Sequence, residues 1–185
     1  GRVSTFYAQK LHRFRHCNVL MQYRTQETVC LDGREITFLV SDLAQGDFLA
    51  DVIARRPLHR LTIFEGLHLL NSLARGVEPM HAAGEHHGNL TLANVMVRRR
   101  GLGFDVKLLD LEKTMGSRAS MIQRDVAALI RMFKEATQCG RSVPAESKSL
   151  AATQRDLTGR ATRGSFRNAG ELSRYLESMT WEKRT

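Results

Sequence analysis

Long hydrophobic runs are missing from this 185-residue sequence: no uninterrupted apolar stretch approaches the roughly 20 residues that a membrane-spanning helix needs. The first residues, GRVSTFYAQKLHRFRHC, form neither a secretory signal peptide nor a clear transit peptide. We therefore expect a soluble, cytoplasmic protein with no transmembrane segment. With 42% hydrophobic residues, a chain of this length suits one domain with a sizeable core.

Cysteine is scarce, and its three positions, Cys17, Cys30 and Cys139, lie far apart in the sequence. No pair has the CxxC spacing that is typical of zinc sites and redox-active dithiols. We therefore expect ordinary, reduced cysteine residues.

Acidic residues are absent from the first 26 positions, which carry five basic ones. Together with a second basic cluster at 98–100 and a formal net charge of +9, this favours anionic partners such as nucleotides, nucleic acid or lipid head groups. A solvated basic face explains the same charge equally well. Aromatic residues make up only 6% and no nucleic-acid-reading motif accompanies the charge, which argues against nucleic acid. We expect an anionic or a protein partner.

The N-terminal part of the sequence predicts a helix followed by a hairpin. Apolar residues recur at helical spacing from Thr5 to Phe14, and an extended stretch follows. Two β-rich runs in TVCLDGREITFLV flank Asp32 and Gly33, which is the strongest hairpin signal in the chain. A short helix is then expected to start near Asp47.

The remainder of the sequence is mainly helical. Apolar residues keep a helical period from Leu61 to Val77, which predicts a long, central, buried helix that ends at Gly84. NVMV and FDVKLL are then short strands, SMIQRDVAALIRMFKEATQ is a helix, GRSVPAESKS is a linker, and NAGELSRYLESMTW is a terminal helix with Asn168 as its N-cap. Helices and strands are segregated along the chain, so the pattern predicts an α+β fold and excludes a doubly wound sheet.

Two amides and a carboxylate form the candidate site. Asn89 and Asn94 lie on the loop after the long helix, and Asp110 ends the second strand of the following small hairpin. In an antiparallel hairpin the start of the first strand lies beside the end of the second strand. Asn94 and Asp110 should therefore be neighbours. Their oxygens are ligands of the kind that Mg²⁺ prefers beside phosphate. Taken without the family resemblance, however, Asn and Asp at strand ends are more often turn formers than metal ligands.

The order of the motifs resembles the protein-kinase superfamily over nearly the whole chain. HGNLTLAN is similar to the catalytic loop H-R-D-L-x-x-x-N, and KLLDLEK is similar to the strand and D-F-G that follow it. LHRFRHCNVL resembles the end of the αC helix, ITFLVSDLAQGDFLADVI the hinge region, LARGVEPMHAAGEHHGNL the approach to the catalytic loop, and RDVAALIRMF the later helix with a structural Asp. The resemblance implies a kinase-like fold with an incomplete N-lobe at 1–44 and a mainly helical C-lobe at 45–185.

The resemblance also implies roles for individual residues. ATP would bind through its adenine to the hinge backbone at Asp42, Leu43 and Ala44, and Asn94 and Asp110 would hold Mg²⁺ on the phosphates. His87 would be a structural residue beneath the loop. Asp125 would hold the backbone of the catalytic loop.

Several positions depart from the kinase pattern. Asn89 stands where the family has its catalytic Asp, which orients the acceptor hydroxyl and accepts its proton. Gly88 replaces the usual Arg, and Thr91 stands where protein-phosphorylating kinases have Lys. Asp110 is followed by Leu-Glu in place of Phe-Gly, and Arg124 follows it by only 14 positions, too few for a full activation and peptide-docking segment. No Gly-rich loop and no V-A-I-K strand are present, and position 7, where the αC Glu would stand, is a tyrosine.

Three functional hypotheses remain open at this point. The first is a pseudokinase, a degenerate kinase-like domain with a partner-binding or regulatory role that also binds nucleotide and magnesium. The second is an active, ATP-dependent phosphotransferase acting on protein Ser/Thr or on a lipopolysaccharide core sugar, because the short segment and D-L-E-K are similar to bacterial kinase-like proteins that include such sugar kinases. The third is a basic interaction module with no role for nucleotide.

Overall fold

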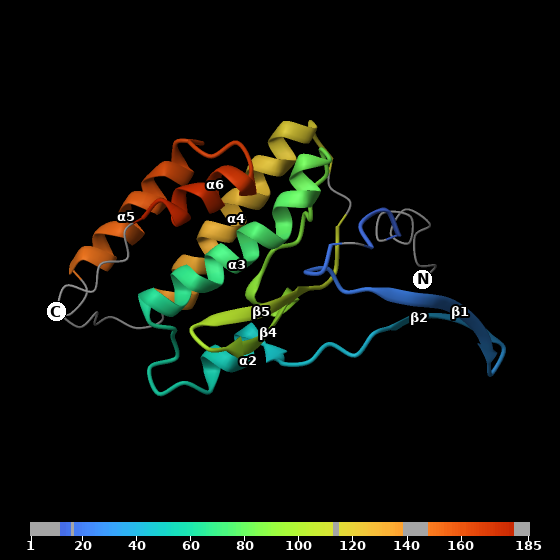
Figure 1. Ribbon diagram of the computed structural model, residues 1–185. Helices are drawn as coiled ribbons and strands as arrows, with labels where there is room; N and C mark the ends of the chain where they lie inside the picture. The colour runs from blue at the N-terminus through green and yellow to red at the C-terminus, as the bar shows by residue number, and fades with distance from the viewer. Residues whose placement is uncertain (1–11, 16, 113–114, 139–147, 180–185) are drawn as a thin grey trace.

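The computed structural model describes residues 12–15, 17–112, 115–138 and 148–179, and its elements are mixed helix and strand (Figure 1). The predicted helix over Thr5–Phe14 lies mostly outside these residues. In chain order the described elements are β1 (Tyr23–Leu31), β2 (Arg34–Ser41), β3 (Asp47–Phe48), α2 (Leu49–Ala54), α3 (Ile63–Ala82), the 3-10 turn η1 (Leu92–Asn94), β4 (Val95–Arg100), β5 (Gly103–Leu108), α4 (Arg118–Gln138), α5 (Lys148–Thr162) and α6 (Ala169–Glu177).

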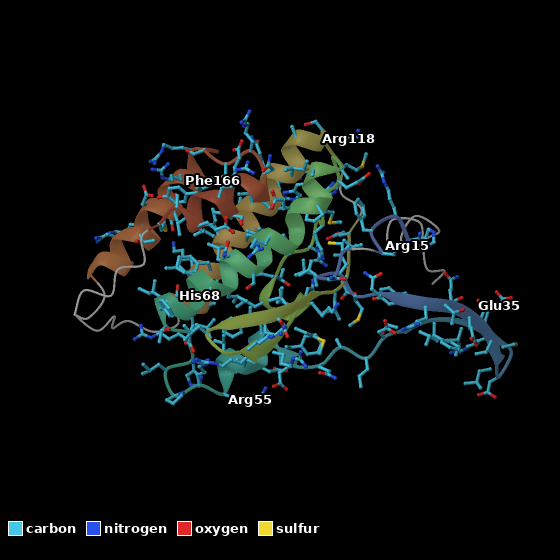
Figure 2. All side chains as sticks on the ribbon, viewed as in Figure 1. Arg15, Glu35, Arg55, His68, Arg118 and Phe166 are labelled. Carbon is cyan, nitrogen blue, oxygen red and sulfur yellow. The ribbon has the colours of Figure 1, made fainter. Side chains whose placement is uncertain are left out.

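Strands β1 and β2 form the predicted antiparallel hairpin, in which Val29 pairs with Ile36. Asp32 and Gly33 form its two-residue turn, with φ of 50° and 73°. Positive φ at both positions matches the twist of the two strands, and Asp-Gly tolerates it at low cost. The hairpin extends away from the helices (Figure 1), and Glu35 lies near its far end (Figure 2).

A second, three-stranded sheet has the order β3-β4-β5 and is antiparallel throughout. The segment before the hairpin is fastened to its edge. Leu20 forms a parallel bridge with Leu108, whose carbonyl accepts from the N–H of Met21 at 3.0 Å. The N–H of Leu108 donates to the carbonyl of Val19 at 2.7 Å. These bonds join the N-terminal part of the molecule to the strand that leads into Asp110.

Helix α3 is the long buried helix that the apolar period predicts. It begins with a capping box, in which the Thr62 hydroxyl accepts from the N–H of Glu65 and the Glu65 carboxylate accepts from the N–H of Thr62. The helix ends at Ala82, and Gly84 then takes a φ of 74°, as glycine does after many helices. None of the helices in the described part of the chain combines the length and apolarity that crossing a bilayer requires.

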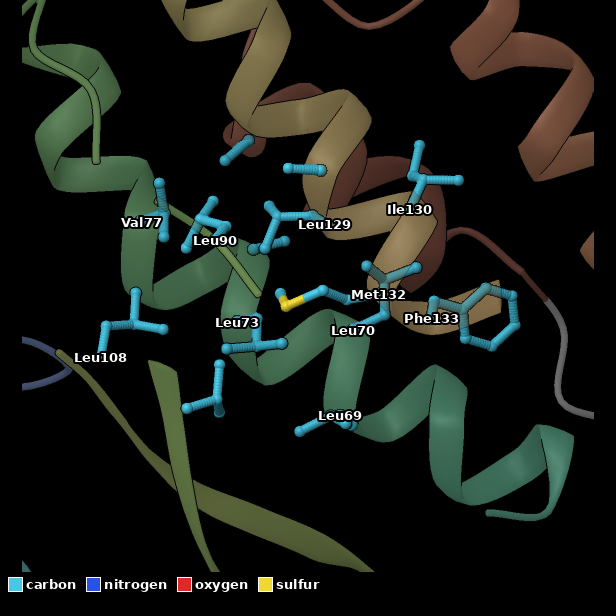
Figure 3. Packing of buried hydrophobic residues seen from close by; sticks show 14 of the residues in the cluster. Leu69, Leu70, Leu73, Val77, Leu90, Leu108, Leu129, Ile130, Met132 and Phe133 are labelled. Carbon is cyan, nitrogen blue, oxygen red and sulfur yellow. The ribbon is translucent and has the colours of Figure 1, made fainter. Parts of the chain in front are cut away.

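The hydrophobic core lies where α3 packs against α4, α6 and the sheet. Figure 3 shows Leu70 and Leu73 of α3 beside Leu129 and Met132 of α4, and all four side chains are almost completely buried. The sheet adds Leu108 to the same cluster. The predicted α+β fold is therefore confirmed as a mainly helical body with small separate sheets.

Two elements differ from the sequence prediction. Helix α2 starts at Leu49, because Asp47 and Phe48 first pair with β4 as strand β3. Helix α5 was not predicted, since KSLAATQRDLTGRAT has few large apolar residues. Within this helix Leu157 is fully buried, and Asp156 accepts from Arg160 at 2.8 Å and from the Tyr175 hydroxyl of α6. Tertiary contacts therefore stabilise a helix that the spacing of its apolar residues does not predict.

Gly76 of α3 permits the close approach of the segment that carries Val19. A Cβ at position 76 would lie 2.5 Å from Cγ2 and 2.7 Å from Cβ of Val19, which is buried. In an open helix Gly→Ala stabilises by about 1 kcal/mol. Here we expect Gly76→Ala to lower the free energy of unfolding by about 1–3 kcal/mol. The clash of the added methyl group with Val19 costs more free energy than the higher helix propensity of alanine contributes. Urea denaturation measures this change.

The matched control for this prediction is the same change in a Val19→Gly background, where the Cβ and both Cγ atoms that the new methyl group would meet are absent. There Gly76→Ala should be neutral or stabilising. Equal effects in the two backgrounds would show that the contact with Val19 does not determine the choice of glycine.

Candidate functional site

The candidate site is built on the loop between α3 and β4. Gly88 takes a φ of 86°, and η1 closes the loop with a hydrogen bond from the N–H of Asn94 to the carbonyl of Thr91 at 3.1 Å. The side chain of Asn94 also spans the loop, because its Nδ2 donates to the carbonyl of Asn89 at 3.1 Å. The N–H of Asn89 points inward and donates to Nδ1 of His87 at 3.3 Å. Two of the sequence-predicted residues are thus in direct contact.

Asp110 lies beside the same loop. The N–H of Leu109, its neighbour, donates to the carbonyl of Asn94 at 2.9 Å, as pairing of β4 with β5 requires. Asp110 itself has a φ of 55°, a left-handed conformation that is uncommon for a residue other than glycine and that often marks functional sites. Two positions later, the N–H of Glu112 donates to the carbonyl of His87 at 3.0 Å. The backbone on both sides of Asp110 is therefore attached to the loop of Asn89 and Asn94.

A buried carboxylate of α4 holds the backbone of this loop through hydrogen bonds. Asp125 of α4 is 2% exposed, and its oxygens accept from the N–H of His87 at 2.6 Å and from the N–H of Gly88 at 2.9 Å. A third hydrogen bond joins it to Nε2 of His81 at 3.1 Å. Burial raises the pKa of Asp125, but these three hydrogen bonds outweigh it and hold the pKa below its usual value. Asp125 is therefore an ionised group inside the protein.

His81 is a site component that the sequence reasoning missed. Its Nδ1 accepts from the N–H of Ala169, the first residue of α6, at 3.0 Å, so Nε2 carries the proton that is donated to Asp125. The ring thus connects the C-terminal helix to the loop. The available signal was that His81 follows Val77 by four residues and so continues the buried stripe of α3, whose members from Leu67 to Met80 are all apolar.

The predicted hinge residues lie apart from the loop. Asp42 follows β2, where its N–H donates to the carbonyl of Gln22 at 3.1 Å and its carboxylate pairs with Arg24. Leu43 is 92% exposed, and Ala44 is half-buried. Leu43 and Ala44 line a pocket of about 890 Å³ that runs along β5 to α3, whereas Asn89, Asn94 and Asp110 do not line it. The structure therefore brings the three loop and strand-end residues together and leaves the hinge as a separate group.

Cys17 forms part of the floor of this hinge pocket. Its thiol donates to the carbonyl of Gly76 at 3.2 Å, and burial raises the pKa of the thiol. Of the cysteines in the described part of the chain, Cys17 and Cys30 are both free.

The donor set suits magnesium held together with phosphate. Among the described residues no group of three His, Cys, Asp or Glu side chains could hold a metal ion. Mg²⁺ bound with substrate phosphates needs only one or two carboxylates and completes its shell with phosphate oxygens and water. Asn94 fits this requirement, since its Nδ2 donates to the carbonyl of Asn89 and its Oδ1 is the remaining polar atom of the side chain. Asp110 would supply the carboxylate.

The fold and the loop define a protein-kinase-like domain. The chain is similar to the solved kinase domain of PknI from Mycobacterium tuberculosis, a double mutant, with a TM-score of 0.57, 15% identity, and coverage of 95% of this chain and 79% of that one. It is also similar to residues 1–466 of Rad53 in complex with AMP-PNP, with a TM-score of 0.55, 14% identity, and coverage of 86% of this chain and 41% of that one. At these identities the likeness shows the fold.

The family of the chain follows from its sequence. The model of the "Lipopolysaccharide kinase (Kdo/WaaP) family" matches residues 33–161, which is more than half of the chain. The protein therefore belongs to the lipopolysaccharide kinase (Kdo/WaaP) family, and the resemblance to the protein-kinase superfamily is confirmed. No curated protein matches the chain.

The anchoring role of Asp125 predicts a pH-dependent stability. Asp125→Asn keeps the shape but removes the charge, and we expect it to lower the free energy of unfolding by about 2–3 kcal/mol near neutral pH. Because the folded pKa is depressed, the carboxylate stabilises fully above its unfolded pKa of about 3.9 and loses this contribution as the pH falls through the lower folded pKa. The gap between wild type and variant should therefore narrow on acidification below about pH 4, as urea denaturation would measure.

Asp51→Asn is the matched control, because Asp51 is an exposed carboxylate on α2. It should change the free energy of unfolding by no more than about 0.5 kcal/mol. A gap between wild type and Asp125→Asn that stays constant down to strong acid would contradict the assignment of an ionised anchor.

Proposed function

We propose that this protein is a nucleotide- and Mg²⁺-binding, kinase-like domain that lacks general-base catalysis and acts chiefly by binding, as a pseudokinase of its family. The observation that carries the proposal is the position of Asn89. It lies on a loop held in shape by Asp125 and Asn94, at the place where the kinase pattern has a catalytic carboxylate. The loop geometry is kept while the basic group is an amide.

Replacing a carboxylate by an amide has a direct chemical consequence. An amide oxygen has no useful basicity near neutral pH, so Asn89 can hydrogen-bond an acceptor hydroxyl and orient it but cannot take its proton. General-base assistance is typically worth about 10²–10⁴-fold in rate. Phosphoryl transfer by this chain should accordingly be absent or very slow.

The proposed ligand is ATP with magnesium. Bound at Asn94 and Asp110, Mg²⁺ would neutralise the charge of the phosphates and position them. Asp110 would supply the charged ligand and Asn94 a neutral one, while the backbone of Asp42, Leu43 and Ala44 would bond the adenine. This ligand suits the expected cytoplasmic location, and the division into 1–44 and 45–185 would put the nucleotide between the two parts.

A second candidate is an active phosphotransferase acting on a lipopolysaccharide sugar. The family match over residues 33–161 favours it. Positioning and electrostatic stabilisation carry much of the rate in phosphoryl transfer, so a site without a base can retain activity. A protein acceptor is less favoured, because Arg124 follows Asp110 by only 14 positions.

Three variants test the nucleotide site. Asp110→Asn should remove most of the Mg²⁺-dependent affinity for ATP, because the carboxylate dominates attraction for the cation. Asn94→Ala should weaken it less, and Asn89→Ala should barely change it, since position 89 faces the acceptor. Titration of ATP with Mg²⁺ and with a chelator, followed by the rise in melting temperature, measures the order. Equal, metal-independent binding by all four proteins would refute the metal assignment.

Restoring the carboxylate tests the loss of the general base. If the remaining site is intact, Asn89→Asp should raise any residual phosphoryl transfer by about 10²-fold or more. ATP consumption in the presence of a lipopolysaccharide core acceptor would measure it, with Asn89→Ala as the control that adds no base. Rapid turnover by the wild-type chain on that acceptor would instead favour the active phosphotransferase.

A further inference from the structure

Strand β5 is the last strand of its sheet, and its outer edge opens into the hinge pocket of about 890 Å³. Four consecutive residues of the strand, Phe104, Asp105, Val106 and Lys107, all line this pocket. Successive side chains of a strand point to opposite faces of the sheet, so a pocket on one face would be lined by alternate residues only. The pocket therefore borders the edge of β5 as well as its face.

The backbone of β5 shows which groups point out of this edge. Both backbone groups of Leu108 bond the segment at 19–21, away from β4. In an antiparallel strand this direction alternates from one residue to the next, so the N–H and C=O groups of Val106 and Phe104 also point away from β4. None of the described residues forms a hydrogen bond with these four groups. Such an unpaired edge is a template for one more strand.

The chain itself already uses one end of this edge. Leu20 forms a parallel bridge with Leu108, and among the described residues the bridge comprises this pair alone. Before it, the segment turns to α3, where the thiol of Cys17 donates to the carbonyl of Gly76 at 3.2 Å. The edge from Phe104 to Val106 thus lies beyond the part that the segment covers.

The one carboxylate among the described residues that line the pocket is that of Asp105. It is compensated on β4, because it accepts from Arg98 at 2.8 Å and lies 3.8 Å from Arg100. The hydrogen bond from Arg98 is the main reason why the pKa of Asp105 lies below its usual value. Asp105 therefore does not make the pocket acidic.

Two further cations line the pocket, Lys107 of β5 and Arg75 of α3. The ammonium group of Lys107 donates to the carbonyl of Asn18, which is neutral, and it has two more N–H groups for other acceptors. Arg75 meets Glu177 at 3.9 Å, but their side chains are 68% and 51% exposed, and such a pair contributes little. The pocket beside the open edge is therefore positively charged.

We propose that the β5 edge and the hinge pocket bind an extended, acidic segment of a partner protein, which adds to the three-stranded sheet as a fourth strand. The outward N–H and C=O groups of Phe104 and Val106 would bond its backbone. The side chains of these two residues belong to or pack on the core, so Lys107 lies on the opposite face. Acidic side chains at every second position of the partner would face Lys107. This inference goes beyond the proposed function, whose residues Asn89, Asn94 and Asp110 do not line the pocket.

The spacing of the groups favours an extended chain over a compact anion. Outward backbone groups recur every second residue, which is about 6.8 Å along an antiparallel strand. Another extended chain repeats this distance, whereas a small anion satisfies only one such group at a time. The cations also come from different elements, since Arg75 lies on α3, Arg98 on β4 and Lys107 on β5. A ligand that runs along the edge can approach all three.

A blocked peptide of sequence EVETEVE tests the inference without relying on activity. Titrated into the full chain, it should bind with an affinity that falls as salt rises, and the basic peptide KVKTKVK should not bind. In hydrogen exchange followed by NMR, the N–H groups of Phe104 and Val106 should become protected. Those of Asp105 and Lys107 pair with β4 and should already be protected without peptide. Absence of binding, or equal binding of the basic peptide, would overturn the proposal.

Protection of the Phe104 and Val106 N–H groups that rises with protein concentration in the absence of peptide would assign the edge to a second copy of this chain. That result would also overturn the proposal of a partner protein.

Two N-methylated forms of EVETEVE distinguish strand addition from charge attraction. One form carries methyl groups on the amide nitrogens of its odd residues, the other on those of its even residues, and their charges are equal. Because only alternate N–H groups of an added strand face β5, one form should bind like the parent peptide and the other should not bind. Equal binding by both forms would show that the backbone edge is not used.

Matched variants locate the charge contribution. Lys107→Gln and Arg75→Gln should each weaken binding of EVETEVE by about two- to fivefold, as expected for partly exposed ion pairs. Lys134→Gln removes the same charge from an exposed position of α4 outside the pocket, and it should leave binding unchanged. Equal weakening by all three variants would indicate a diffuse charge effect and contradict a defined site.

Mg-ATP titrations separate this inference from the proposed function. Lys107→Gln and Arg75→Gln should leave the rise in melting temperature caused by Mg-ATP unchanged. Peptide binding without nucleotide binding would refute the nucleotide proposal and support the β5 edge, and nucleotide binding without peptide binding would do the reverse. Displacement of the peptide by Mg-ATP would assign the hinge pocket to the nucleotide and overturn the inference.

Discussion

Burying a carboxylate as deeply as that of Asp125, which is 2% exposed, costs several kcal/mol unless its oxygens are hydrogen-bonded. The protein meets this requirement with two backbone N–H groups of the loop and with His81. If the loop backbone left its position, the carboxylate of Asp125 would lose two hydrogen-bond donors and stay buried in the core. The position of Asn89 follows from that constraint, because it is the next residue along the chain.

The same constraint explains how a kinase-like loop can keep its shape whether or not it performs chemistry. His81 bonds both Asp125 and the N–H of Ala169, so the loop is coupled to α6, which packs into the common core. Stability alone would then preserve the loop. The shape of the loop is therefore evidence for the fold and not for catalysis. Function must be argued from the side chains of the loop, and Asn89 stands at the position where the kinase pattern has its catalytic carboxylate.

Much of the fold could be predicted because local signals agreed with tertiary packing. The period of α3, the Asp32-Gly33 turn and the Asn168 cap each reflect a local preference that the structure keeps. The proximity of Asn94 to the end of β5 followed from hairpin pairing. Helix α5, the role of His81 and the hinge pocket could not be predicted, because each depends on contacts between distant parts of the chain. The boundary at residue 44 and the roles of the site residues stay predictions.

The charge at position 89 separates the shape of the loop from its chemistry. An aspartate there, as in the kinase pattern, would be able to accept the proton of an acceptor hydroxyl. The amide of Asn89 is neutral and lines a pocket with Arg124 and Arg131. The hydrogen bonds from the N–H groups of His87 and Gly88 to Asp125 do not involve the side chain at position 89, so the loop keeps the same anchor with either residue. The stability of the loop therefore gives no reason to keep a carboxylate at position 89, and only a requirement for proton transfer would do so.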